Sequence, residues 1–82
     1  MSAINIQTKE NITINHMIDL MEDVNNFLPK NIQILAPILT QNGLIFTVDS
    51  NNLKIDQPIM KFIEGLITGW LIANNLNASY NN

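Results

Sequence analysis

One segment near the C-terminal end constrains the fold more than any other, because it is too apolar to be covered on one side only. Between residues 57 and 76, apolar residues recur at helical spacing around well over half of the circumference: Ile59, Met60, Phe62, Ile63, Leu66, Ile67, Trp70 and Leu71. Asp56 is a suitable N-cap, and Pro58 is tolerated in a first helical turn. Such a helix is expected to be buried on more than one side.

A second, shorter helix is predicted over residues 14–27. Apolar residues at steps of three and four form one stripe, which comprises Ile14, Met17, Ile18, Met21, Val24 and Leu28. Thr13 is a suitable N-cap, and Pro29 stops the helix. The opposite, solvated face is then expected to carry His16, Asp19, Glu22, Asp23 and Asn26.

Residues 32–49 carry the clearest hairpin signal. Asn42 and Gly43 tolerate the positive φ angles of a two-residue type I′ turn. That turn pairs Gln41 with Leu44, Leu39 with Phe46 and Pro37 with Val48. One sheet face would carry Leu35, Leu39, Leu44, Phe46 and Val48, and the other Ile34, Ile38, Ile45, Thr40 and Thr47. Pro37 cannot donate to a strand ladder, so this strand is expected at a sheet edge or with a bulge.

Two short strands complete the predicted fold, one over residues 4–7 and one over residues 53–55. The order is then β-α-β-β-β-α, which predicts a single α+β domain spanning residues 1–82. The expected architecture is a two-layer sandwich, in which a short antiparallel sheet packs against two helices. The polar residues 77–82 are expected to fray.

Composition argues against several classes of function. Seven acidic residues face four lysines and no arginine, whereas nucleic-acid binding normally needs a clustered, arginine-containing basic surface. Cysteine is absent and histidine occurs once, which argues against disulfides and zinc sites. The longest uncharged apolar stretch, residues 65–73, is too short to cross a bilayer. We therefore expect no cofactor, metal, nucleic acid or membrane partner, and a cytoplasmic location (host cytoplasm for a viral protein).

No set of reactive side chains predicts catalysis. His16, Asp19 and Asp23 share a helix face that could hold a divalent cation, but a solvated face with a local ion pair is the simpler interpretation. Asp49 and Asp56 could form an acid–base pair, yet one closes a strand and the other caps a helix. The protein is expected not to be an enzyme.

Apolar surfaces are the candidate interaction sites. Gly65 and Gly69 lie inside the predicted helix over residues 57–76. Each glycine inside a helix costs roughly 0.5–1 kcal/mol relative to alanine, so these two imply a packing reason, within one subunit or between subunits. A two-layer sandwich also buries only one face of its sheet, so the second hairpin face offers one route to self-association. The ridge of Gly65, Gly69 and Ala73 on the last helix offers another, which is slightly preferred because its glycines otherwise weaken the helix. The candidate interface residues are Ile34, Ile38, Ile45, Gly65, Gly69, Trp70, Ala73 and Tyr80.

These features favour a small acidic interaction protein, a homodimer or higher oligomer, that binds and inhibits or modulates a partner protein. In its most concrete form this hypothesis describes a viral or phage-encoded inhibitor of a host defence or regulatory protein. Two alternatives stay open. One is an oligomeric small-molecule or nucleotide-binding protein, and the other is a structural or assembly subunit of a larger particle.

Overall fold

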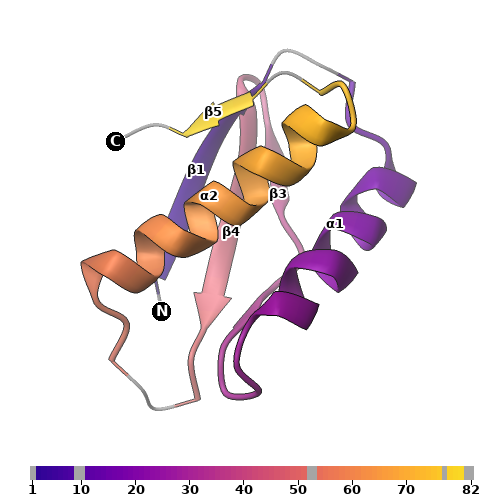
Figure 1. The fold of residues 1–82 in the computed structure, drawn as a ribbon. Helices are drawn as coiled ribbons and strands as arrows, with labels where there is room; N and C mark the ends of the chain where they lie inside the picture. The colour runs from indigo at the N-terminus through magenta and orange to yellow at the C-terminus, as the bar shows by residue number, and fades with distance from the viewer. Residues whose placement is uncertain (1, 9–10, 52–53, 77, 81–82) are drawn as a thin grey trace.

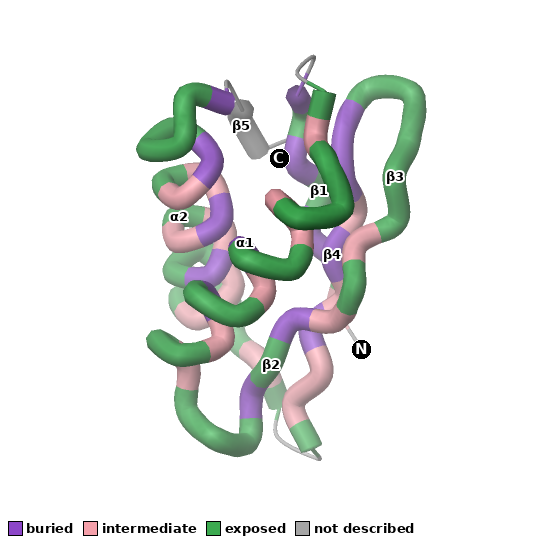
Figure 2. The backbone as a smooth tube through the Cα atoms, turned by 90° about the vertical axis from the view of Figure 1, so that its right-hand side faces the viewer, coloured by how far each residue is buried: buried purple, intermediate pink, exposed green. Residues whose placement is uncertain are grey.

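The protein is an α+β fold with both helices on one face of an antiparallel sheet (Figures 1 and 2). The computed structural model describes residues 2–8, 11–51, 54–76 and 78–80. Its elements are β1 (Ser2–Thr8), α1 (Ile14–Phe27), β2 (Gln33–Ile34), β3 (Ile38–Thr40), β4 (Gly43–Asp49), α2 (Gln57–Ala73) and β5 (Ala78–Tyr80). The order β-α-β-β-β-α is confirmed, and β5 follows it.

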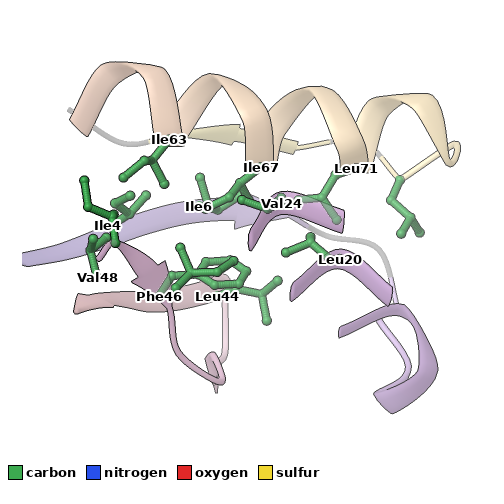
Figure 3. Close-up of a cluster of buried hydrophobic side chains, with 13 residues drawn as sticks. Ile4, Ile6, Leu20, Val24, Leu44, Phe46, Val48, Ile63, Ile67 and Leu71 are labelled. Atoms are coloured by element: carbon green, nitrogen blue, oxygen red, sulfur yellow. The ribbon is translucent and has the colours of Figure 1, made fainter. Parts of the chain in front are cut away.

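Within the described residues, β1 and β4 form the centre of the sheet. They pair antiparallel over six residue pairs, with Ile4 opposite Phe46 and Ile6 opposite Leu44. β5 flanks β1, while β2 and β3 both pair with the other side of β4. Alternate side chains of β1 and β4 point toward the helices and form the floor of the core (Figure 3).

Helix α1 has the predicted bounds because both of its ends are capped. The Thr13 hydroxyl accepts a hydrogen bond from the His16 amide at 3.1 Å, and the Thr13 amide donates to His16 Nδ1 at 3.3 Å. His16 therefore occupies the capping-box position where Glu or Gln is usual. At the other end Leu28, in extended conformation before Pro29, forms the C-cap.

The apolar stripe predicted for α1 is wrong on one side. Leu20 and Val24 are the fully buried residues of the helix, whereas Ile14 and Ile18 are 74% and 55% exposed. The buried side of the helix is therefore turned about the helix axis relative to the predicted stripe, because α1 packs against α2 as well as against the sheet. The side that carries His16 therefore faces α2.

Helix α2 lies over the sheet with a straight line of buried side chains. Ile63, Ile67 and Leu71, four residues apart, are completely buried and point at the strands (Figure 3). The Asp56 carboxylate caps the first turn by accepting from the Ile59 amide at 3.1 Å. The helix ends three residues earlier than predicted, at Ala73.

An asparagine in left-handed conformation ends α2. Asn75 has φ 62°, and its amide donates to the Ile72 carbonyl at 3.0 Å. The following Leu76 amide donates to the Leu71 carbonyl at 2.8 Å, which completes a Schellman motif. Leu76 is buried, so this turn also closes the core at the end of the helix layer.

The predicted hairpin turn is misplaced by one residue. Thr40 lies opposite Gly43 and Leu39 opposite Leu44, so the two turn residues are Gln41 and Asn42. Asn42 does not have the positive φ expected of it. Gly43 has the expected positive φ (159°) and is required for a second reason: a Cβ there would lie 1.9 Å from the Ile6 carbonyl oxygen on β1.

A bulge divides the first arm of the hairpin, as Pro37 predicts. Ile34 pairs with Val48 and Ile38 pairs with Ile45, so three residues on this arm oppose two on β4. The extra residue turns Ile34 onto the helix side of the sheet, where it is 1% exposed. Its predicted place beside Ile38 and Ile45 on the second face is therefore wrong.

The predicted strand over residues 53–55 and the predicted frayed tail also differ from the structure. Lys54 and Ile55 are not in a strand, and Leu53, the other residue of the predicted strand, lies outside the described residues. Within the tail that was expected to fray, Ala78–Tyr80 forms β5 against β1, with Ile6 opposite Tyr80. Asn77, Asn81 and Asn82 lie outside the described residues.

Candidate interaction groove

A groove of about 270 Å³ lies between α1 and α2. Helix α1 contributes Asp23, Val24 and Phe27 to its walls, and α2 contributes Gly65, Leu66, Gly69 and Trp70. Gly65 and Gly69 fall on the opposite side of α2 from the buried line through Ile67, so the groove opens away from the sheet. We refer to it as the helix groove.

The two glycines of the helix groove are not needed for packing within the subunit. A Cβ added at Gly65 or at Gly69 would meet no described atom within 4 Å. No described element therefore approaches the backbone of α2 at these positions. Of the two packing reasons that the sequence allows, the one within the subunit has no support in the structure.

A polar contact between the helices forms one end of the helix groove. The Trp70 Nε1–H donates a hydrogen bond of 2.7 Å to Asp23 Oδ2. The His16 ring meets the Trp70 ring edge to face, with 6.5 Å between ring centroids. The predicted solvated face is wrong for His16, which is half-buried against Trp70, whereas Asp23 is exposed as predicted although it accepts from Trp70.

Two phenylalanines are exposed beside the groove. Phe27, in its α1 wall, is 71% exposed, and Phe62 is 54% exposed. Phe62 lies one helical turn before Leu66, so it extends the apolar wall of α2 toward the start of that helix. Large apolar side chains grouped around a hollow are typical of an interaction surface.

The charges near the groove are acidic on the α1 side. Helix α1 contains Asp19, Glu22 and Asp23, all exposed, and neither lysine nor arginine. Lys61, the lysine of α2, lies one helical turn before Gly65 but does not line the groove. Asp23 therefore places negative charge in the α1 wall, and Asp19 and Glu22 add negative charge to the exposed surface of α1 outside the groove lining.

A second, flatter surface is the sheet face that the helices leave uncovered. Ile38 lies directly opposite Ile45, and Ile45 lies directly opposite Asn5 on β1. Opposed residues of antiparallel strands project from the same face, so these three are neighbours. Ile38 is 62% exposed and Ile45 is half-buried. We refer to this surface as the open sheet face.

The structure thus does not bring the predicted interface residues together on one surface. Gly65, Gly69 and Trp70 line the helix groove, and Ala73 is exposed one turn beyond Gly69. Ile38 and Ile45 lie on the open sheet face, while Ile34 is in the core. For Tyr80 the structure describes only the backbone, which pairs with β1.

Sequence reasoning missed Phe27 and Asp23 as groove residues. Phe27 was the last residue of the predicted helix but outside its apolar stripe, which is the available signal that a large aromatic would be exposed. Nothing in the sequence pairs Asp23 with Trp70, because the two lie on different helices.

The chemistry available elsewhere is limited. Over the described ranges, no group of three or more His, Asp or Glu side chains is placed to hold a metal ion. Glu64 Oε2 and Thr68 Oγ1 are buried without a hydrogen-bond partner among the described residues, on one flank of α2. None of the helices that the structure describes has the length and apolar character needed to cross a bilayer.

Comparison of the chain with protein-family models, with curated proteins and with solved structures finds no match.

Proposed function

We propose that the protein is a non-enzymatic interaction protein that binds a partner protein through the helix groove and thereby inhibits or modulates it. One observation carries the proposal: Gly65 and Gly69 lie beneath open space, in a groove whose α1 wall exposes Phe27. Mid-helix glycine lowers stability, and here no contact within the described subunit compensates. Close approach by a partner supplies the missing reason.

The lining of the groove favours a protein side chain over a nucleotide. Binding sites for drug-sized molecules usually enclose about 300–1,000 Å³, and this groove is smaller and open to one side. Phosphate groups would also meet the Asp23 carboxylate, and no lysine lines the groove. An apolar side chain from a partner protein fits this lining better.

The one histidine supports a non-enzymatic function. His16 already accepts a hydrogen bond from the Thr13 amide and packs against the Trp70 ring. These contacts account for its position as helix capping and helix–helix packing, without a reactive role. We therefore propose that His16→Ala leaves partner binding unchanged, provided that the variant folds.

We also propose self-association, through the open sheet face rather than through the groove. Ile38 and Ile45 are adjacent there, on the face of β4 opposite the buried residues Leu44 and Phe46. Sedimentation at micromolar concentration tests this: the wild type should form a dimer or higher oligomer and Ile38→Ser should weaken it. A wild-type monomer of 9.3 kDa would contradict self-association and leave partner binding intact.

The test of partner binding compares captured proteins. Wild-type protein and Gly69→Leu are immobilised, exposed to lysate of the source cells, and the retained proteins are identified by mass spectrometry. A partner should be retained by the wild type and by Ile38→Ser, whose change lies on the open sheet face, and should be lost with Gly69→Leu. Equal retention by Gly69→Leu would place the interaction outside the groove. Circular dichroism establishes that each variant is folded.

A further inference from the structure

We propose that the helix groove accepts an amphipathic α-helix of the partner protein, with an apolar stripe in the groove and lysine or arginine along the flank that meets α1. This inference rests on the proposed function and specifies the chemistry of the partner. Three features of the groove support it: its shape, its glycines and its one-sided charge.

The shape is that of a site between two packed helices. Helix α2 has 17 residues and is therefore about 25 Å long, and α1 packs against its side. Phe27 from α1 and Phe62 from α2 are both exposed. A third helix laid along the pair would cover both phenylalanines with alternate turns of one apolar stripe, which is how amphipathic helices bind in grooves.

The glycines let a helix come close to α2. Without a Cβ at Gly65 or Gly69, the backbone of α2 forms this part of the groove surface. A partner helix can then approach α2 more closely than ordinary side chains allow, as small residues do between packed helices. Leu66 and Trp70 stand beside the two glycines and would contact the apolar stripe.

The negative charge of α1 determines which flank of the partner helix should be basic. Asp19 and Glu22 are exposed on α1, and Asp23 keeps Oδ1 available while Oδ2 accepts from Trp70. A basic flank beside α1 would meet this negative wall, which fixes the orientation of the partner helix and accelerates its association. A second copy of the chain does not supply such a flank, because α1 has no cation and α2 has one lysine, Lys61.

The single tryptophan of the chain provides the readout, because Trp70 lines the groove. Three tryptophan-free peptides of equal length are titrated against the protein while Trp70 fluorescence is followed. The first has an apolar helical stripe flanked on one side by lysines, the second replaces those lysines with glutamates, and the third carries the first composition in scrambled order.

The lysine-flanked peptide is expected to bind, and the other two at least about tenfold more weakly. Raising the salt from about 50 mM to about 500 mM should weaken the first peptide several-fold, because exposed charges are screened. Gly69→Leu should weaken it about tenfold or more by filling the groove. The double variant D19K/E22K needs no change in packing, and should reverse the preference toward the glutamate-flanked peptide.

The opposite outcomes are distinct. Equal binding of the lysine and glutamate peptides would overturn the basic flank, and an unchanged preference in the double variant would do the same. If no peptide binds while the wild type retains a partner that Gly69→Leu loses, the helical occupant is wrong and the proposed function stands. A dimer that Gly69→Leu dissociates would place a second copy in the groove and overturn the inference.

Discussion

The helix groove and the open sheet face are both exposed, but they differ in how much apolar surface they concentrate. On the sheet face, Ile38 and Ile45 stand beside Asn5, and the outward residues of β1 are polar or small. In the groove, a phenylalanine, a leucine and a tryptophan surround two glycines. A flat surface with two isoleucines can be solvated, whereas a hollow with apolar walls suits a partner that fills it.

Two glycines make the same contrast at the level of single atoms. At Gly43, an added Cβ would collide with the Ile6 carbonyl oxygen of β1, so the sheet itself requires the absence of a side chain. At Gly69, an added Cβ would project into open space. The first glycine is explained by the fold of one subunit, and the second is not. Replacing each glycine by alanine and measuring the free energy of unfolding tests whether the fold of one subunit needs it.

The largest effect is expected for Gly43→Ala, which adds one methyl group at the centre of the sheet. Since the Cβ would lie 1.9 Å from the Ile6 carbonyl oxygen, β1 and β4 must move apart. We expect a loss of about 3 kcal/mol or more in the free energy of unfolding, the upper range for overpacking. Urea denaturation measures it. An unchanged midpoint would mean that β1 does not approach Gly43 so closely.

Asn25→Ala should cost about 2 kcal/mol, because two backbone groups of the sheet lose their partner. The Asn25 side chain accepts from the Ile34 amide at 2.8 Å and donates to the Ile34 carbonyl at 3.2 Å. This clamp fixes α1, one wall of the groove, to β2. The neighbouring Asn26→Ala is the matched control, since Asn26 is exposed, and should change thermal stability little. Equal effects at both positions would contradict the clamp.

Gly69→Ala should raise the free energy of unfolding by roughly 0.5–1 kcal/mol, because alanine favours the helix and its Cβ meets nothing. It adds the same methyl group as Gly43→Ala, so the two variants should shift the denaturation midpoint in opposite directions. A loss of stability at Gly69 would show that a contact within the subunit needs the glycine, and would weaken the case for an outside partner.

The smallest effect is expected for Ile38→Ser on the open sheet face. An exposed side chain away from the core usually changes stability by less than about 0.5 kcal/mol. Chemical denaturation at low protein concentration, where association is weakest, measures the subunit alone. A cost that grows with protein concentration is expected from the proposed self-association, because another copy then covers Ile38. A cost well above about 0.5 kcal/mol at low concentration would contradict an exposed Ile38.

Local chemistry explains which parts of the fold the sequence predicts. The bounds of α1 follow from Thr13 and Pro29, which act within one helical turn, and the structure has them where expected. The rotation of α1 does not follow, because two overlapping arcs of apolar residues fit the sequence equally well. Packing against α2 selects the arc containing Leu20, which was outside the predicted stripe.

Contacts between distant strands explain the errors in the sheet. An Asn-Gly pair is a strong turn signal. Here, however, a glycine is needed at position 43 because β1, more than thirty residues earlier in the sequence, leaves no space for a side chain. The bulge at Pro37 was expected from its missing amide, while its consequence, the inward turn of Ile34, depends on the exact register with β4. For the groove, the glycine spacing and Trp70 were visible in the sequence. The acidic wall became visible only when α1 was placed.

The pairing of β1 with β5 has a consequence for how the chain reaches its native state. Residues 6–8 of the central strand β1 lie beside residues 78–80, so this flank of β1 gains its neighbour only after residues 78–80 have been synthesised. Pairings between such distant segments slow folding. An unpaired strand edge is also a template for other chains. Until β5 is made, this edge of β1 is therefore open to pairing with other chains.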